Sequence, residues 1–318
     1  MKKSFTAGIA LFLVIVCSFT LTFAGEKTEK ELLQETVTLA KEVKAFGKTL
    51  GIEPTEAFTK STLDKPHRPL LGMYLKKLGT ITPGYDMVVN IKLETTEEIT
   101  IKSFGVYYTV RGERYSYYMR KEYVYASEKD PMVIAPSVAK RSLAHKVESV
   151  LHEDLHDNMR TDDQMDEGII LPLGYLAAAE FFRHKNDYGN SREMSDWISQ
   201  TLTMSDELNA FRKKAEEIFR KFPLDEARKR ARKLIASYPT YARDYDDQTK
   251  DQHPDWVLEA KISHDLAYYT NFGRIVRMLN SAGDLKILIA DLKKMPRNSG
   301  DLKNYLDALE KKYKSPTK

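Results

Sequence analysis

The sequence has almost no cysteine: the single one, Cys17, follows an apolar run near the N-terminus. Residues 1–24 begin with lysines, continue through that run and end in small residues, which predicts a secretory signal peptide cut after Ala24. Val16 is too large for the position before a lipid-bearing cysteine, which argues against a lipoprotein. The mature chain would then be exported, to the periplasm or the medium, without any disulfide. An uncleaved membrane anchor is the alternative.

A strong charge of one sign is also missing. Lysine and arginine together number 50, against 46 aspartates and glutamates, which gives a net charge of +4. This near balance gives no reason to expect nucleic acid or an anionic membrane as a partner. The basic run at residues 228–233 falls on a predicted helix and is interpreted as a solvated face. The leader is shorter than a typical membrane span, and we expect no span in the mature protein.

The mature chain shows two kinds of apolar spacing, one typical of strands and one typical of helices. Alternating apolar and β-branched residues between 80 and 127 predict three or four antiparallel strands. Residues 26–50, and nearly everything after Ser137 as a first N-cap, have the three- and four-residue apolar spacing of helices. The predicted helices of the C-terminal half cover residues 191–220, 224–242, 256–281, 285–294 and 301–312. The fold class is therefore α+β, with a small antiparallel sheet and a mostly helical remainder. Residues 25–135 and 136–318 would form one catalytic unit.

The most informative stretch is ESVLHEDLHDNM, in which His152, Glu153 and His156 form the pattern H-E-x-x-H on a predicted helix. Residues four apart share one helix face, so the two imidazoles can bind one zinc ion. The glutamate between them can take a proton from a water molecule that the ion polarises. Catalytic zinc needs a third protein ligand, and Glu167 in QMDEGII, eleven residues on, is the candidate.

The route of the chain from the histidines to this glutamate can be read in part. Thr161 to Gln164 fits a capping box, which predicts a second helix that returns antiparallel to the first. Gly168 removes a side chain where backbones need to approach closely. Pro172 either kinks the second helix or marks a later start. The alternative is a surface helix with two incidental histidines and no metal.

The combination of VLHEDLH and MDEGIILPLGYLAAAEFF resembles the glutamate-zincins, or gluzincins, in which Glu-Gly on a second helix follows the H-E-x-x-H helix. The chain is more closely similar to a bacterial envelope family of aminopeptidases, loosely so outside the zinc motif. This resemblance implies a zincin-like fold, zinc ligands at His152, His156 and Glu167, and Glu153 as the general base. Two positions depart from the family: Asp154 is charged, and Leu258-Glu259 replaces an asparagine pair.

The function that the resemblance implies is a zinc-dependent metallopeptidase that hydrolyses peptide bonds, with an aminopeptidase as the narrower expectation. The oxyanion of the reaction needs a donor, and His264, Tyr268 and Tyr269 lie in a segment that resembles the family. An edge strand of the sheet could pair with an extended peptide substrate. The alternative is a non-catalytic envelope protein with a structural or vestigial metal site and a helical partner-binding region.

An aminopeptidase also needs an acidic group to hold the free amine of its substrate. Asp163, Asp166 and Glu180 lie near the motif, but no pattern selects one of them. The substrate, the cleavage position and the oligomeric state do not follow from the sequence.

Overall fold

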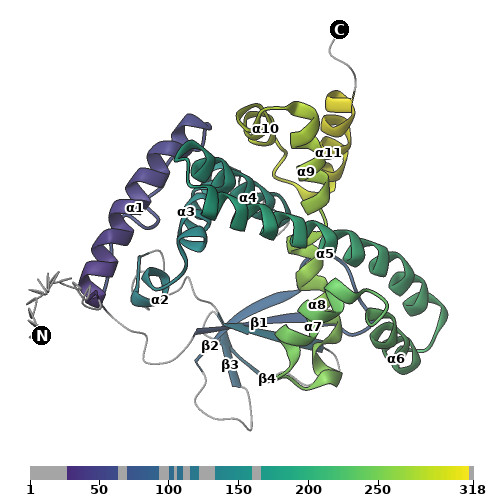
Figure 1. Ribbon diagram of the computed structural model, residues 1–318. Helices are drawn as coiled ribbons and strands as arrows, with labels where there is room; N and C mark the ends of the chain where they lie inside the picture. Colours follow the sequence, from purple (N-terminus) through teal and green to yellow (C-terminus); the bar gives the residue numbers. More distant parts are fainter. Residues whose placement is uncertain are drawn as a thin grey trace, which may run out of the picture.

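The computed structural model describes residues 27–63, 70–92, 100–103, 106–109, 115–121, 133–159 and 166–314. The signal peptide and the capping box predicted at Thr161 lie outside these residues. Within them, no helix is both long enough and apolar enough to cross a membrane. Helices dominate and the sheet is small and antiparallel, so the α+β prediction is confirmed at this level (Figure 1).

The main sheet has three strands in the order β2-β1-β5, and both pairings are antiparallel. Its strands are β1 (Leu70–Lys77), β2 (Met87–Lys92) and β5 (Tyr115–Lys121). A separate two-stranded ladder joins β3 (Thr100–Ser103) to β4 (Val106–Thr109). The strands predicted between residues 80 and 127 are present, but the central strand β1 lies before that region. Its residues Met73, Tyr74 and Leu75 are buried in succession, so β1 lacks the alternation that marks a half-exposed strand.

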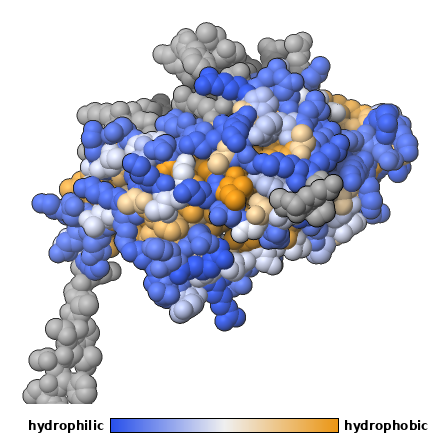
Figure 2. All heavy atoms as spheres, turned by 90° about the horizontal axis from the view of Figure 1, so that it is seen from above, coloured by the Kyte–Doolittle hydropathy of each residue, from blue (hydrophilic) through white to orange (hydrophobic). Residues whose placement is uncertain are grey.

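The first of two apolar cores lies among the helices that carry the metal motif. Val43, Val147, Leu151 and Leu173 are among the fully buried residues of this core. Its helices are α1 (Glu29–Thr49), α2 (Pro136–Ala139), α3 (Leu143–Asn158), α4 (Glu167–His184), α9 (Phe272–Ala282), α10 (Leu285–Leu292) and α11 (Ser299–Lys314), and Met194 near the start of α5 (Tyr188–Lys221) also belongs to it. Seen from above, the molecule is mostly hydrophilic, with apolar side chains in a band across the middle (Figure 2).

The second core joins the sheet to the long helices, with Tyr74 and Tyr118 from the strands meeting Phe211 and Tyr241. Its helices are α5 (Tyr188–Lys221), α6 (Leu224–Ile235), α7 (Pro239–Thr249) and α8 (Pro254–Tyr269). Helix α8 packs against β5, β1 and α4. Because it touches both the sheet and the motif-bearing helices, α8 links the two halves of the protein (Figure 1).

Several predicted helices prove to be two. The predicted helix at residues 224–242 breaks before Pro239, because the residue before a proline avoids helical geometry, and α7 begins at the proline. The predicted helix at residues 256–281 divides into α8 and α9 around Thr270 and Asn271.

The helix predicted to begin at Ser137 is likewise interrupted. A four-residue turn, α2, precedes α3, and Ser142 caps α3 by accepting a hydrogen bond from the His145 backbone at 3.3 Å. Pro172 lies inside α4, which begins at Glu167.

The basic run on α6 is only partly a solvated face. Arg230 pairs with Glu226 on the surface. Arg228 instead pairs with the fully buried Glu259 of α8, Nε to Oε1, at 2.9 Å. Much of this positive charge therefore joins α6 to α8.

Candidate metal site

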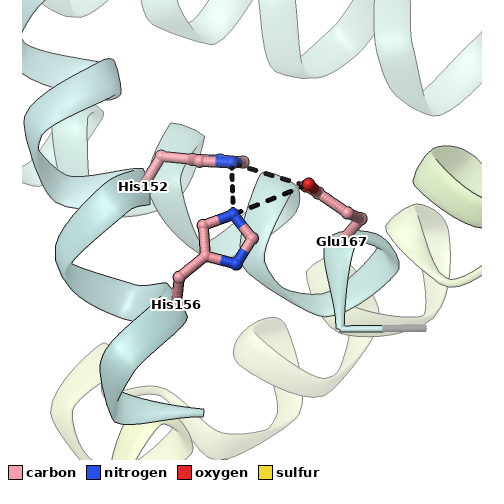
Figure 3. Close-up of side chains that lie close together, drawn as sticks. All are labelled: His152, His156 and Glu167. Carbon is pink, nitrogen blue, oxygen red and sulfur yellow. Dashed lines mark hydrogen bonds and ion pairs between the residues drawn. The ribbon is translucent and has the colours of Figure 1, made fainter. Parts of the chain in front are cut away.

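Three side chains converge where α3 meets the first residue of α4 (Figure 3). The Nε2 atoms of His152 and His156 lie 3.1 Å apart. The two carboxylate oxygens of Glu167 lie 3.4 Å from Nε2 of His152 and 3.6 Å from Nε2 of His156. Zinc with bonds of about 2.0–2.1 Å and tetrahedral angles holds neighbouring ligand atoms about 3.3 Å apart. The spacing of this triad therefore fits one zinc ion with a fourth position left open.

Each imidazole faces a further carboxylate on its other nitrogen. Oε1 of Glu148, one turn earlier on α3, lies 3.5 Å from Nδ1 of His152. Oδ2 of Asp166, next to the proposed glutamate ligand, lies 3.8 Å from Nδ1 of His156. Carboxylates that accept a hydrogen bond from this nitrogen fix the tautomer and orientation of metal-binding histidines. Both rings are turned so that Nε2 faces the centre of the triad (Figure 3), and each Nδ1 faces its carboxylate.

The triad also contains polar atoms that lack a suitable partner. Among the described residues, Nδ1 of His152 and Oε2 of Glu167 are buried without a hydrogen bond. Buried polar groups in folded proteins are nearly always bonded, so each exception needs a reason. For the carboxylate oxygen, a bound cation would supply that reason, and the donor set of two imidazoles and one carboxylate suits zinc.

The charges of the triad are strongly coupled. Burial opposes protonation of His152, yet the adjacent carboxylate of Glu167 raises the pKa of the imidazole. Burial would raise the pKa of Glu167, but the adjacent imidazole of His152 holds the pKa of this carboxyl well below its usual value. Protonation of the imidazole therefore competes with metal binding at this site. Burial also raises the pKa of Glu153 above its usual value.

A glycine of α4 allows the two helices to approach at this point. A Cβ on Gly174 would lie 3.3 Å from Oε1 of Glu148 and 3.4 Å from Cβ of His152. This close approach presses α4 against the face of α3 that carries the first histidine.

The second glycine, Gly168, packs the start of α4 against α8. A Cβ there would lie 2.7 Å from the backbone oxygen of Ala267, closer than side chains tolerate. The predicted reason for this glycine, a close backbone approach, is confirmed. The contact places Glu167 beside Tyr268, whose hydroxyl donates to Oε1 of the carboxylate at 3.2 Å.

The three candidate donors on α8 have different surroundings. Tyr268 reaches the triad, and its ring stacks on His264 with centroids 4.6 Å apart. Tyr269 instead packs against the second core, and its backbone oxygen accepts a hydrogen bond from Ser205 at 2.7 Å. Among the described residues, Tyr269 forms no hydrogen bond or ring contact with His152, His156 or Glu167.

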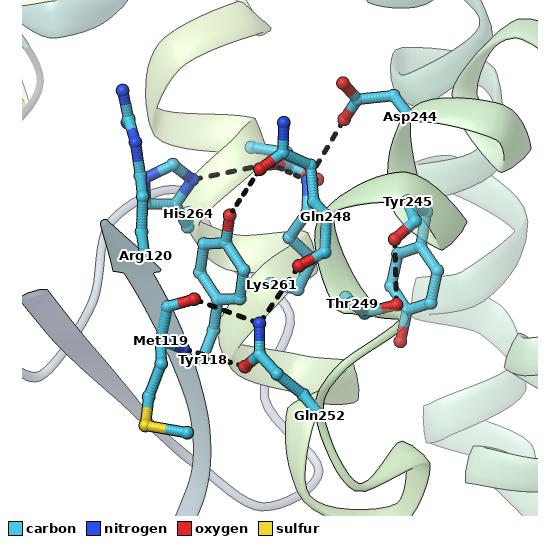
Figure 4. Close-up of polar contacts among 11 residues, drawn as sticks. Tyr118, Met119, Arg120, Asp244, Tyr245, Gln248, Thr249, Gln252, Lys261 and His264 are labelled. Atoms are coloured by element: carbon cyan, nitrogen blue, oxygen red, sulfur yellow. Dashed lines mark hydrogen bonds and ion pairs between the residues drawn. The ribbon is translucent and has the colours of Figure 1, made fainter. Parts of the chain in front are cut away.

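His264 is buried next to the triad but does not contact it. Its Nδ1 lies 3.3 Å from the carboxylate of Asp265, and its Nε2 lies 3.4 Å from Nη1 of Arg120 on β5 (Figure 4). Burial lowers the pKa of His264 to about 4, so the ring is neutral at pH 7. A neutral ring can accept a hydrogen bond from the arginine and donate one to the aspartate.

Arg120 was not anticipated from the sequence. Its guanidinium lies over the ring of Tyr268, 5.4 Å from the centroid, and its charge helps to lower the pKa of Glu167. The arginine comes from a strand far from the motif in sequence, so no local pattern signals it. Glu148 was also missed, although its place four residues before His152 is a readable signal.

The acidic residues considered for binding a substrate amine also differ in their distance from the triad. Asp166 lies at the triad, whereas Glu180 pairs with Arg183 on the partly exposed side of α4. Asp163 lies outside the described residues.

The two departures from the gluzincin-like pattern occupy buried positions. Asp154 accepts from the backbone and hydroxyl of Thr55, at 3.0 and 2.7 Å, and pairs with Lys44 of α1. Leu258 belongs to the second core, and Glu259 pairs with the α6 arginine described above. Both departures therefore serve packing between elements in this chain.

Comparisons with protein-family models, curated proteins and solved structures gave no significant match. Membership of the gluzincins accordingly stays a prediction.

Proposed function

We propose that this protein is an exported zinc-dependent metallopeptidase with a zincin-like fold. The observation that carries the proposal is the convergence of His152, His156 and Glu167, with ligand atoms 3.1–3.6 Å apart. Two half-buried carboxylates behind the imidazoles support it. A chance cluster on a surface helix would not need this support.

Within the proposed mechanism, Nε2 of His152, Nε2 of His156 and the carboxylate of Glu167 would hold zinc. The ion would lower the pKa of a bound water towards neutrality and would polarise the scissile carbonyl. Glu153, on the same helix, would accept the proton, and burial raises the pKa of its carboxyl, which makes the carboxylate a stronger base. Tyr268, the candidate whose hydroxyl reaches the triad, donates to the developing oxyanion.

Docking of an extended peptide along β5 meets an obstacle. The backbone N–H of Met119 donates to Oε1 of Gln252 at 2.8 Å, and the backbone carbonyl of Met119 accepts from Nε2 of Gln252 at 2.9 Å. The Gln252 side chain thus already bonds both backbone groups of Met119, which an added strand would need for its own hydrogen bonds (Figure 4). We therefore place the peptide against the triad and Arg120, with aminopeptidase activity as the narrower proposal.

The first test is metal analysis of the purified protein after zinc reconstitution, with one zinc per chain expected. Glu153→Gln should keep the metal and lose hydrolysis, because glutamine cannot accept the proton. Glu167→Ala should lose the metal. Peptides with free and with acetylated N-termini, read by mass spectrometry, then identify the cleavage. Removal of single residues from free N-termini only would support the aminopeptidase, whereas internal cuts in both sets would indicate an endopeptidase.

Two results would contradict the proposal. A zinc content near zero after reconstitution would remove the site. One zinc per chain without cleavage of either peptide set would favour a non-catalytic envelope protein with a structural metal.

A further inference from the structure

A row of buried polar residues runs along α8 towards the triad, and the proposed mechanism leaves most of it unused. Lys261, His264 and Asp265 are each at most 4% exposed. Residues three and four apart lie on one face of a helix, so the row continues to Tyr268, which reaches Glu167. Burying charged and polar groups is costly unless each of them is paired, so such a row needs a reason.

The carboxylate of Asp265 is held in place by a buried lysine. Nζ of Lys261, one turn earlier, lies 2.6 and 2.7 Å from the two oxygens of this carboxylate, and 3.1 Å from Oδ2 of Asp244 on α7. Burial would raise the pKa of Asp265, but the charge of Lys261 lowers it below its usual value. A fixed, ionised carboxylate therefore lies beside the ring of His264.

This carboxylate determines which nitrogen of His264 carries the proton. Nδ1 of the ring lies 3.3 Å from Oδ1 of Asp265, and an ionised carboxylate can only accept a hydrogen bond. The proton of the neutral ring therefore lies on Nδ1, and the lone pair of Nε2 faces Nη1 of Arg120 at 3.4 Å. Figure 4 shows Arg120 and His264 side by side. The ring itself is held between Tyr74 and Tyr268, each with its centroid 4.6 Å away.

The histidine thereby helps to hold a guanidinium close to the triad. Arg120 is only partly buried, and its guanidinium lies over the ring of Tyr268, 5.4 Å from the centroid. The hydroxyl of the same tyrosine bonds Glu167. A guanidinium carries five N–H donors in one rigid plane, so a bond from Nη1 to His264 sets the direction of the other donors.

We infer that Asp265 and His264 are positioning residues of the proposed peptidase site, and that through them Arg120 is oriented to donate a hydrogen bond to a backbone carbonyl of the bound peptide. The inference rests on the proposed function and adds to it a group that binds the substrate without touching zinc. A guanidinium can only donate, and every residue of an extended peptide offers a carbonyl acceptor. Loss of a positioning residue therefore weakens peptide binding and leaves the zinc content unchanged.

The first test observes the histidine itself and needs neither zinc nor turnover. Long-range ¹H–¹⁵N NMR spectra of protein labelled with ¹⁵N-histidine distinguish the two neutral tautomers, and the signals lost in His264→Gln assign this ring. At pH 7 we expect the neutral form with its proton on Nδ1. Asp265→Asn should lose this preference, because an amide can donate as well as accept. A wild-type ring with its proton on Nε2, or a protonated ring, would overturn the inference, since neither can accept from Arg120.

The second test measures peptide affinity in zinc-loaded Glu153→Gln protein, which binds peptide without cleaving it. The probe is the pentapeptide amide Ala-Leu-Phe-Leu-Ala, which has no carboxylate, titrated by isothermal calorimetry. His264→Phe keeps a ring against Tyr268 but removes the acceptor, and should weaken binding about tenfold, as should Arg120→Gln. His264→Gln offers an amide oxygen near the former place of Nε2 and should lose less than about threefold. His253→Phe, at the exposed start of α8, is the control and should leave the affinity unchanged.

A double variant separates positioning from a merely structural role. His264→Phe added to Arg120→Gln should weaken binding no further, because the histidine acts through the arginine. Additive losses, or less than one zinc per chain in His264→Phe, would overturn the inference. If His264→Phe fails to fold in a thermal melt, His264→Gln decides, since a folded variant that loses as much affinity as Arg120→Gln also contradicts the inference. A wild-type protein that binds neither zinc nor the peptide would instead refute the peptidase, and this inference with it.

Discussion

Oε1 of Glu148 lies 3.5 Å from Nδ1 of His152, one turn away on the same helix. The imidazole therefore has a carboxylate on each side, because Glu167 faces its Nε2 at 3.4 Å. In the proposed zinc site the two carboxylates have different tasks. Glu167 binds the metal, and Glu148 orients the ring and increases the basicity of the ligand nitrogen.

Glu148→Ala should accordingly weaken zinc binding about 10- to 100-fold, as is typical when a carboxylate behind a metal-binding histidine is lost. Competition with a chromogenic chelator measures this affinity. Glu180→Ala removes an acid from the partly exposed face of α4 and serves as the matched control. Equal zinc affinities of the two variants would show that the carboxylate of Glu148 does not support the site.

The buried pair of Asp154 and Lys44 gives a prediction about stability. Asp154→Leu should lower the free energy of unfolding by about 3–5 kcal/mol, because it leaves the lysine buried without its counter-charge. The double variant Asp154→Leu, Lys44→Met should recover part of this loss, since neither charge then remains while the two donors of Thr55 still lack their acceptor. Urea denaturation of the two variants and the wild type measures the difference. A double variant no more stable than the single one would contradict this account of the pair.

The part of the site that lies on neighbouring helical turns could be predicted from the sequence. The pairing of His152 with His156 follows from the four-residue repeat of a helix, and Glu167 needs only a short return of the chain. The choice between Tyr268 and Tyr269 could not be made in this way. Helix α8 is buried on nearly all its sides, so its apolar pattern does not reveal which face meets the triad.

Contacts between segments far apart in the sequence could not be predicted from local patterns. The central strand β1 was not predicted because its residues are buried in succession, and burial on both faces removes the alternation that marks a strand. Arg120 reaches the site from β5, and its position depends on how the sheet packs against α8. Such contacts depend on tertiary packing, which the local sequence pattern does not contain.

The contact between Gly168 and α8 predicts a linked loss of stability and metal binding. Gly168→Ala would place a Cβ 2.7 Å from the backbone oxygen of Ala267, so α4 must shift. We expect the free energy of unfolding to fall by about 1–3 kcal/mol and zinc affinity to fall with it, because Glu167 is the adjacent residue. Gly189→Ala, at the start of α5 where the nearest atom lies 3.7 Å away, is the control. Unchanged zinc affinity in a destabilised Gly168→Ala protein would show that the contact does not position the ligand.

Asp291 provides a prediction on acid stability, away from the metal site. Burial would raise its pKa, but Lys312, Tyr313 and Lys294 hold it at about 2. The folded pKa lies below the unfolded value of about 3.9, so this stabilisation is complete above about pH 4 and is lost as the pH falls towards 2.

Asp291→Asn should therefore lower the free energy of unfolding by about 1–3 kcal/mol at pH 7. The difference in unfolding free energy between the variant and the wild type should shrink as the pH falls from 4 to 2. Denaturant unfolding across this pH range measures it, with the exposed Asp247→Asn as control. A difference that stays constant with pH would exclude the proposed origin.

The last prediction separates the two neighbouring tyrosines of α8. The hydroxyl of Tyr268 donates to Glu167 at 3.2 Å, whereas Tyr269 packs against the second core. Tyr268→Phe should leave the zinc content at one per chain and KM nearly unchanged while kcat falls about 100-fold or more, because the lost donor acts on the transition state. Tyr269→Phe should leave kcat unchanged. If Tyr268 only holds Glu167 in place, Tyr268→Phe should instead weaken zinc binding, and activity should return with added zinc. An unchanged kcat in Tyr268→Phe would mean that its hydroxyl does not act on the transition state and that the donor comes from another group, with Arg120 as the next to test.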